Sequence, residues 1–437
     1  MSIEWFGILP ERWEIKRSYS MFAENTATNE ALVAKKPLQF RFGEIVAKKA
    51  IESDVHFFDS IKRYIIVEPN DIIINGLNLN YDFITQRCAI VKDNGCITPA
   101  YVLLRPRDTI VPMYACYLLK AMDGQKVING LGTGIRLTLS YSEFKKINLP
   151  LPPLEEQDQI ARYLDWKVSL INRLIAAKRR QIALLKEQKQ AIINTAVTRG
   201  GNGWKKMKLR HICQINASIL ERLKLYESKT FVTFLPMEKI STDGKIDCSE
   251  KRKIQDVRSG FTSFAKNDVV VAKITPCFEN GKGACLDSLE TEIGFGTTEL
   301  IVLRANEKVI PKYLYLITYS SSFRKQGEDS MTGSAGQKRV PVNFIANFQI
   351  LLPTLDEQYK IIARLDEKCS AIDKVTVKLN DEIALFTEYR TRLISDVVTG
   401  KLDVRAVAIP KYEMAKENIT ADNDELFDDE NIAEDEE

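Results

Sequence analysis

One stretch of this chain occurs twice. Residues 152–160 (PPLEEQDQI) return 201 positions later as residues 353–361 (PTLDEQYKI). The alignment continues without a gap to Thr198 and Thr399, and it contains 17 identities in 47 positions. A repeat of this length indicates a duplicated structural unit, so the chain is expected to fold as two copies of one module.

The repeat divides the 437 residues into alternating blocks, and a chain of this length can bury more than one core. Each helical block lacks Gly and Pro internally and ends at a glycine, Gly200 or Gly400. Each mixed block opens near a tryptophan, Trp13 or Trp204. The predicted boundaries are a first mixed domain at 1–151, a central long helix at 152–201, a second mixed domain at 202–352, a distal long helix at 353–402 and an acidic, disordered tail at 403–437.

Short runs of β-branched and aromatic residues predict strands inside the first mixed block, and Pro112 begins a predicted helix that ends at Met122. The predicted strands are 63–67, 71–74, 88–91 and 101–105. The second mixed block repeats this pattern, with segments 267–271, 297–304 and 311–314 in the places of 70–74, 98–105 and 112–115. The fold class is therefore α+β, with two mixed α/β domains separated and joined by two long helices.

The two helical blocks have heptad character, which predicts an antiparallel coiled coil with pseudo-two-fold symmetry. A helix of 45 residues is about 65 Å long at ~1.5 Å per residue, so the pair could fix the distance between two binding domains. The alternative is two unrelated surface helices, each packed on its neighbouring domain. The predicted interface residues are Leu164, Ile171, Ile175, Ile182, Leu185, Ile192, Leu365, Ile372, Leu379, Ile383, Phe386 and Leu393.

Charge is distributed unevenly along the chain. Residues 411–437 hold 12 Asp and Glu but 2 Lys, whereas the remaining 410 residues hold 60 Lys and Arg against 47 Asp and Glu. A basic body is suited to a polyanionic partner such as DNA, although a solvated basic surface would look the same.

Catalytic and metal-binding signatures are missing from the sequence. Eight cysteines form no CxxC pair and only two histidines are present, so no metal site is predicted. The phosphate-binding loop GxxxxGK[ST] does not occur, and no catalytic residue is proposed. Unpaired thiols, together with the lack of a signal peptide or an apolar run long enough to span a bilayer, predict a cytoplasmic protein.

DNA-binding candidates occur at matching places in the two mixed blocks. A loop of small residues ending in a cation precedes each long helix, and such a loop lets backbone amides approach phosphate while Arg or Gln can contact a base edge. An ordinary exposed turn is the alternative, and it is the more common explanation for asparagine-rich loops. The candidates are Gly132, Thr133, Gly134, Arg136, Asn75, Asn78 and Arg87 in the first block, and Lys273, Thr275, Lys282, Gly333, Ser334, Gln337, Lys338 and Arg339 in the second.

Both long helices open with the sequence Pro-x-Leu-[Asp/Glu]-Glu-Gln-x-x-Ile, and a glycine-rich loop precedes each opening. In these features the chain resembles the specificity subunits of type I restriction–modification systems. The resemblance covers nearly the whole sequence. It implies two target-recognition domains, each reading one half of an interrupted DNA sequence.

The resemblance also implies a non-catalytic subunit that recruits two modification subunits, which methylate DNA, and restriction subunits, which cut it. No cofactor is expected in this chain, and the partner subunits would use S-adenosylmethionine, ATP and magnesium. The alternative function is a coiled-coil scaffold that does not bind DNA.

Overall fold

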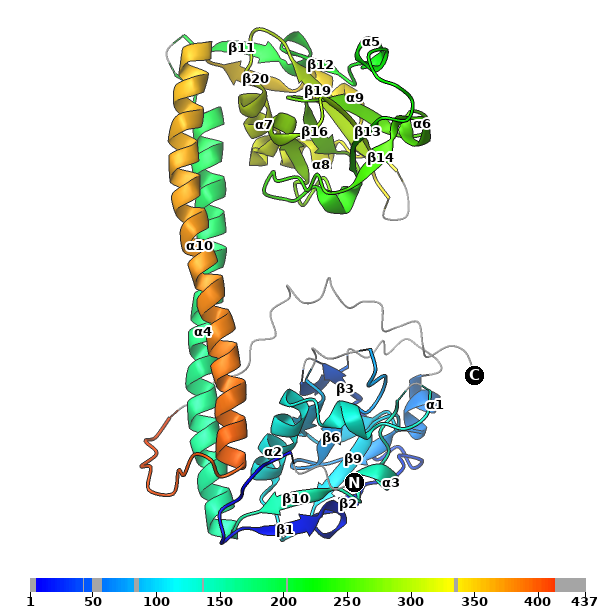
Figure 1. Cartoon of the computed structure of the whole chain (residues 1–437), viewed down its shortest axis with the longest axis vertical. Helices are drawn as coiled ribbons and strands as arrows, with labels where there is room; N and C mark the ends of the chain where they lie inside the picture. The colour runs from blue at the N-terminus through cyan, green and yellow to red at the C-terminus, as the bar shows by residue number, and fades with distance from the viewer. Residues whose placement is uncertain are drawn as a thin grey trace. The chain divides into compact units, whose positions relative to one another are not determined.

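The computed structural model describes residues 5–41, 43–48, 57–81, 86–135, 137–201, 203–333 and 337–412. These form two compact units (Figure 1). Unit 1 comprises the described residues of 1–179 and 380–437, and unit 2 comprises those of 180–379. Each unit contains one mixed domain together with part of both long helices. This division runs through both helices and does not test the domain boundaries predicted from the sequence.

The core of the first mixed domain is an antiparallel four-stranded sheet in the order β2-β9-β6-β7. Its central strand β6 is three consecutive isoleucines, all buried, because both faces of the strand are covered. Helix α2 (Pro112–Gly124) packs against β7 and begins at a proline, which is suited to the first helical position. The four strands of this sheet are β2 (Phe22–Glu24), β9 (Val102–Pro106), β6 (Ile72–Ile74) and β7 (Cys88–Ile90).

The second mixed domain contains the same sheet, in the order β12-β19-β16-β17, and helix α7 (Pro311–Tyr319) packs on it as α2 does on its sheet. The strands and helices predicted from the sequence in these two cores are therefore present. The strands of the second sheet are β12 (Cys213–Ile215), β19 (Leu300–Ala305), β16 (Val269–Ala272) and β17 (Gly283–Cys285).

Outside the shared sheet the two domains differ. Among the described residues, the first domain adds two separate pairs, β3-β4 and β5-β8. The second domain instead adds a four-stranded sheet, β14-β13-β18-β15, in which β13 and β18 are parallel. The strands are β3 (Leu38–Arg41), β4 (Glu44–Ala47), β5 (Ile65–Val67), β8 (Gly95–Ile97), β13 (Phe231–Leu235), β14 (Lys251–Lys253), β15 (Thr262–Ala265) and β18 (Ile293–Gly296).

Short helices complete the two domains. They connect strands, and α8 also packs beside α7. They are α1 (Phe57–Lys62), α3 (Tyr141–Phe144), α5 (Leu220–Leu223), α6 (Ile254–Val257), α8 (Ser321–Asp329) and α9 (Val342–Asn347), with 3₁₀ turns η1 (Ser18–Ser20), η2 (Ile128–Leu131), η3 (Leu209–His211), η4 (Met237–Lys239) and η5 (Leu286–Ser288).

An antiparallel strand pair closes each domain and leads into a long helix. β1 (Glu14–Arg17) pairs with β10 (Asn148–Leu151), and β11 (Lys205–Lys208) pairs with β20 (Gln349–Leu352). Prolines follow β10 and β20 at once, and a proline has no N–H to donate to a further ladder hydrogen bond. The long helices are α4 (Leu154–Thr198) and α10 (Leu355–Val398), as expected from the heptad pattern.

The glutamine of the repeated motif is buried at the start of each long helix. Gln358 is 0% exposed; its amide donates to the carbonyls of Lys308 and Pro353 at 3.0 and 3.1 Å, and its oxygen accepts from the amide of Ile310 at 2.8 Å. Ile310 is the N-cap of α7, where backbone N–H groups lack partners within the helix. One side chain thus joins the long helix, the closing strand and the domain helix.

Gln157 makes the same contacts in the first domain. It is 1% exposed, donates to the carbonyls of Thr109 and Pro152, and accepts from the amide of Val111, the N-cap of α2, at 2.8 Å. The motif is therefore repeated because its glutamine satisfies the same buried backbone groups twice.

The glutamate that precedes this glutamine has different hydrogen-bond partners in the two copies. Glu357 accepts from the amide and hydroxyl of Thr354, which forms a capping box at the start of α10. Pro153 takes the place of this threonine in the first copy and has no N–H to donate. Glu156 instead accepts two hydrogen bonds from Arg12, at 2.9 and 2.6 Å, and so ties the N-terminal segment to α4.

The long helices pair antiparallel within each unit (Figure 1). In unit 1, Arg390 donates to Asn172 at 2.6 Å and Lys178 forms an ion pair with Glu382. In unit 2, Lys189 forms an ion pair with Asp373 at 2.7 Å. In these pairs the residue numbers rise along one helix as they fall along the other, so the helices are antiparallel. Polar residues that interrupt the heptad pattern form these hydrogen bonds and ion pairs with the opposite helix.

All twelve predicted interface residues are at least half-buried. Several of them also belong to the domain cores: Leu164 and Leu393 lie in the core of the first domain, and Leu365 lies in that of the second. The helices thus pack both on each other and on their domains. The buried members are Leu164, Ile171, Ile175, Ile182, Leu365, Leu379 and Leu393, and the half-buried ones are Leu185, Ile192, Ile372, Ile383 and Phe386.

Replacing the buried glutamine should destabilise unit 2. Gln358→Leu leaves two carbonyls and one amide without partners in a dry site, so the free energy of unfolding should fall by about 1–3 kcal/mol in urea titrations. Gln181→Leu, at an exposed position of α4, is the matched control and should change it by less than about 0.5 kcal/mol. Equal effects of both variants would contradict the role given to Gln358.

Candidate nucleic-acid interface

Two loops that are far apart in the sequence lie against each other in the first domain. One follows the central strand β6, and the other is the glycine-rich hairpin before α3. The amide of Leu79 donates to the carbonyl of Leu137 at 3.1 Å, and the amide of Leu139 donates to that of Gly76 at 2.9 Å. Candidates predicted separately from sequence, around Asn75 and around Gly132, therefore belong to one surface.

The second domain builds the same arrangement after β16. The amide of Thr275 donates to the carbonyl of Lys338 at 3.0 Å, and the amide of Val340 donates to that of Lys273 at 2.8 Å. Thr332 and Arg339 close the hairpin through reciprocal backbone bonds of 3.1 and 2.8 Å. Both copies thus present a post-strand loop and a hairpin side by side.

The first hairpin depends on its glycines. A Cβ at Gly132 would lie 2.8 Å from the backbone of Leu137, and Gly134 has a φ of +80°, in the left-handed region that favours glycine. Thr133 and Gly134 are exposed, as is Asn78 in the adjoining loop. Arg136, the predicted cation of this hairpin, lies outside the described residues.

Two exposed hydrophobic side chains beside these candidates were missed by the sequence reasoning. Ile135 is 99% exposed at the hairpin and Tyr81 is 78% exposed in the post-strand loop. Solvent-exposed hydrophobic residues are common on protein surfaces, so the residues alone gave no usable signal. Their position next to Thr133 and Asn78 adds a flat ring and an aliphatic group to this surface.

Arg87 is placed differently from the other candidates of the first domain. It is 2% exposed, and its guanidinium donates to the carbonyls of Asn75 and Leu77 at 3.1 and 2.8 Å. The side-chain oxygen of Asn75 accepts from the amide of Leu77 at 3.2 Å. Both residues support the shape of the post-strand loop, and Arg87 does not present its charge to solvent.

The hairpin of the second domain carries more charge. Gln337 and Lys338 are exposed, and Lys338 makes no ion pair with any other described residue. Arg339 is half-buried and binds Glu299 through Nε and Nη2 at 3.0 and 2.9 Å. Gly333 is exposed with a φ of +135°, and Ser334 lies outside the described residues.

The remaining candidates of the second domain are half-buried in the post-strand loop. The hydroxyl of Thr275 accepts from the amide of Lys338 at 3.1 Å, which joins the loop to the hairpin. Lys282 donates from Nζ to the carbonyl of Met237 at 3.0 Å. Lys273 follows β16 directly and raises the positive potential around Glu299. Three of the predicted cations of this domain, Lys273, Lys282 and Lys338, thus belong to the post-strand loop and the hairpin that it contacts.

An ion pair between a buried aspartate and a partly exposed arginine fixes the turn into the central strand in both domains. Arg105 of β9 binds Asp71 with two bonds of 2.9 Å, and Arg304 of β19 binds Asp268 at 2.8 and 2.7 Å. Both aspartates are buried. Bidentate geometry makes these pairs strong and directional. In the sequence, an Asn-Asp step precedes each of these apolar strands, at residues 70–71 and 267–268.

Metal and membrane sites can be assessed for the described ranges. No cluster of three or more His, Cys, Asp or Glu residues there could hold a metal ion. In the same ranges, no helix combines the length and apolar character needed to cross a bilayer.

A family model described as "Type I restriction modification DNA specificity domain" matches residues 57–184 and, a second time, residues 201–385. The chain belongs to this family. Each match begins in one mixed domain and extends into the long helix that follows, so the family domain is the same duplicated unit that the repeat indicated.

Relatives within the family cover the chain to different extents. The type I restriction enzyme EcoAI specificity subunit of Escherichia coli is 44% identical over 178 residues, which is 40% of this chain and 29% of the relative. The MjaVIII specificity subunit of Methanocaldococcus jannaschii is 23% identical over 426 residues, 91% of this chain and 94% of that protein. The alignment with this chain therefore covers less than a third of the length of the EcoAI subunit, but it covers nearly the whole length of the MjaVIII subunit.

A solved chain from a study of complex assembly and conformational transition in a type I R-M system shares the fold. It superposes with a TM-score of 0.66 at 13% identity, over 90% of this chain and 100% of the solved one. The assignment of individual DNA-contacting residues in this specificity-family chain stays a prediction.

The Arg339–Glu299 pair should make stability depend on pH. The hydrogen bond from Arg339 holds the pKa of Glu299 below its ordinary value of 4.5. A lowered folded-state pKa stabilises the fold above the unfolded value, and this contribution is lost as the pH falls. Arg339→Met should therefore lower thermal stability slightly at pH 7, and this difference should shrink as the pH falls below 4.5. A difference that persisted unchanged at pH 3 would contradict the pairing.

Proposed function

We propose that this chain is the DNA sequence-recognition subunit of a type I restriction–modification complex. Each mixed domain reads one half of a bipartite, interrupted target. The observation that carries the proposal is that both copies of the specificity domain place a post-strand loop and a glycine-rich hairpin side by side, joined by the same pattern of backbone hydrogen bonds. A scaffold that does not bind DNA is not favoured, because the matching family is one of DNA specificity domains.

The proposed contacts divide by chemistry. Lys273, Lys282, Lys338 and Arg136 would neutralise phosphates and set the position of the domain on DNA. Gln337, Asn78 and Arg339 carry groups that can contact base edges in the major groove. Gly132, Thr133, Gly134, Thr275, Gly333 and Ser334 would allow close backbone approach. Asn75 and Arg87 are left out of the contact surface, because their polar groups hold the loop itself.

In this proposal the partner subunits carry out catalysis and bind the cofactors. Two modification subunits would bind S-adenosylmethionine and methylate the target, and restriction subunits would use ATP and magnesium to translocate and cut. The assembly would work in the cytoplasm. The proposal that the length of the paired helices sets the distance between half-sites stays a prediction, as does the role of the acidic tail.

The methylome of the host tests the function directly. Deleting the gene should abolish methylation at one bipartite motif and leave other motifs unchanged, because this chain would supply the specificity of one enzyme. Restoring the gene should restore that motif. An unchanged set of methylated motifs after deletion would contradict the proposed function.

The second hairpin can be tested by binding. Lys338→Ala should weaken binding of the assembled complex to duplex DNA, and the slope of log K against log salt should fall by about 1 in magnitude for one lost phosphate contact. Lys360→Ala, at an exposed position of α10, is the charge-matched control. The same salt slope for Lys338→Ala as for the control would remove Lys338 from the interface.

A further inference from the structure

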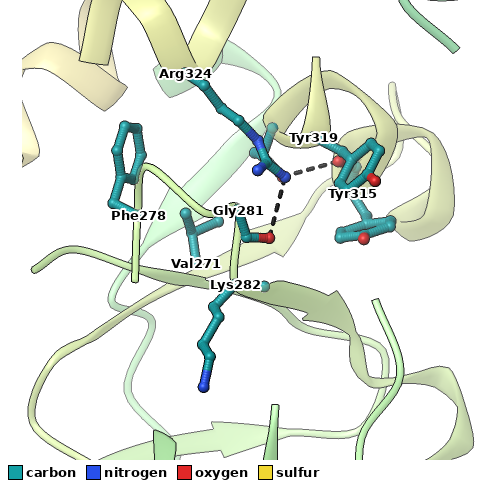
Figure 2. Close-up of a pocket in the computed structure, with 9 residues that line it drawn as sticks. Val271, Phe278, Gly281, Lys282, Tyr315, Tyr319 and Arg324 are labelled. Atoms are coloured by element: carbon teal, nitrogen blue, oxygen red, sulfur yellow. Dashed lines mark hydrogen bonds between the residues drawn. The ribbon is translucent and has the colours of Figure 1, made fainter. Parts of the chain in front are cut away.

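One half-buried arginine supports the post-strand loop of the second domain. Nη2 of Arg324 donates to the carbonyl of Gly281 at 3.0 Å, and its guanidinium lies over the ring of Tyr319 at 4.5 Å (Figure 2). Gly281 has a φ of +78°, and a Cβ there would collide with the guanidinium. Arg324 thus occupies the space that a side chain at position 281 would need, and it holds the residue directly before Lys282.

The position of Arg324 is unfavourable for the stability of the fold. It forms no ion pair with any described residue, its Nε is buried without a hydrogen-bond partner, and burial lowers the pKa of the guanidinium. Burying a cation without a carboxylate costs stability, so its contribution to folding alone does not explain the arrangement.

The helix that carries Arg324 is a firm support. Phe323 of α8 contacts Phe278 of the loop at a ring distance of 5.9 Å, and a Cβ at Gly327 would lie 2.3 Å from the same Phe278 ring. The start of α8 is bound to the long helix, since Asn194 of α4 donates to the hydroxyl of Ser321 at 2.7 Å and accepts from its amide at 2.8 Å. The loop is therefore anchored through α8 to α4, all within unit 2.

In the first domain a different arginine, Arg87, supports the corresponding loop. Arg87, at the edge of β7, donates to the carbonyls of Asn75 and Leu77 in the corresponding loop. The two arginines come from different elements and bind different positions. Each copy thus has a guanidinium that donates to at least one carbonyl of this loop, although the arginine comes from a different element in each.

We propose that Arg324 is a specificity-positioning residue: it holds the loop of residues 274–282 in the shape that reads the half-site of the second domain, without contacting DNA itself. This rests on the proposed function. Because binding requires a preorganised loop, loss of Arg324 lets the loop sample other shapes and accept other bases.

The test compares methylomes of host strains carrying full-length variants. Arg324→Ala should lower the sequence specificity at one half of the methylated motif. Methylation at sites with a single mismatch in that half should rise about tenfold relative to the intact site, and methylation at sites with a mismatch in the other half should not change. Arg324→Lys keeps the charge and one donor, and should show a smaller relaxation. Val257→Ala, which removes buried atoms from a separate cluster of the same domain, should lower thermal stability and leave the motif unchanged.

Salt dependence separates positioning from direct contact. The slope of log K against log salt should be the same for Arg324→Ala and the wild-type complex, whereas loss of a phosphate contact would reduce it. A strict motif in Arg324→Ala, relaxation of both halves, or a reduced salt slope would each overturn the inference while leaving the proposed function intact. Deletion of the gene without any change in the methylome would overturn both.

Discussion

The buried glutamine at the start of each long helix is the interaction on which the rest of the architecture depends. Gln157 and Gln358 each connect three elements that meet at one point: the long helix, the closing strand and the N-terminus of α2 or α7. Their amides satisfy both donors and acceptors that water cannot reach. Each mixed domain is therefore fixed on its own part of the helix pair through directional bonds as well as through apolar packing.

Duplication has preserved this junction and the sheet beside it while the outer parts of the domains changed. The sheets β2-β9-β6-β7 and β12-β19-β16-β17 correspond strand for strand, and each has an Asp–Arg pair at its central strand. The additional strands, four in the described part of each domain, differ in pairing and in direction: two antiparallel pairs in the first domain, and one sheet with a parallel pair in the second. The candidate loops start from the shared sheet, so two different surfaces can be carried at equivalent places of one scaffold.

The long helices, the shared strands and the place of the candidate loops could be predicted from sequence, because periodicity and repetition are local signals. The function of particular side chains could not. Arg87 and Arg339 are both loop cations in the sequence, yet one is buried against carbonyls and the other is bound to Glu299. Nor did any local pattern indicate Arg324, since its partner Gly281 is 43 residues away and comes from another element.

Hydrogen bonds from arginines within each domain would leave the outer side chains of the candidate loops available for the proposed contact with DNA. A loop that is held by an arginine of its own domain depends less on its outward side chains for stability. Lys338 of the adjoining hairpin is exposed, so it can change with little cost to the fold. Rigid support would also lower the entropy lost on binding a matched site and would deny the loop the other shapes that a mismatched site needs, which would increase the difference in affinity between the two. Specificity would then depend on two separable sets of residues, those that contact DNA and those that hold the contacting loops in shape.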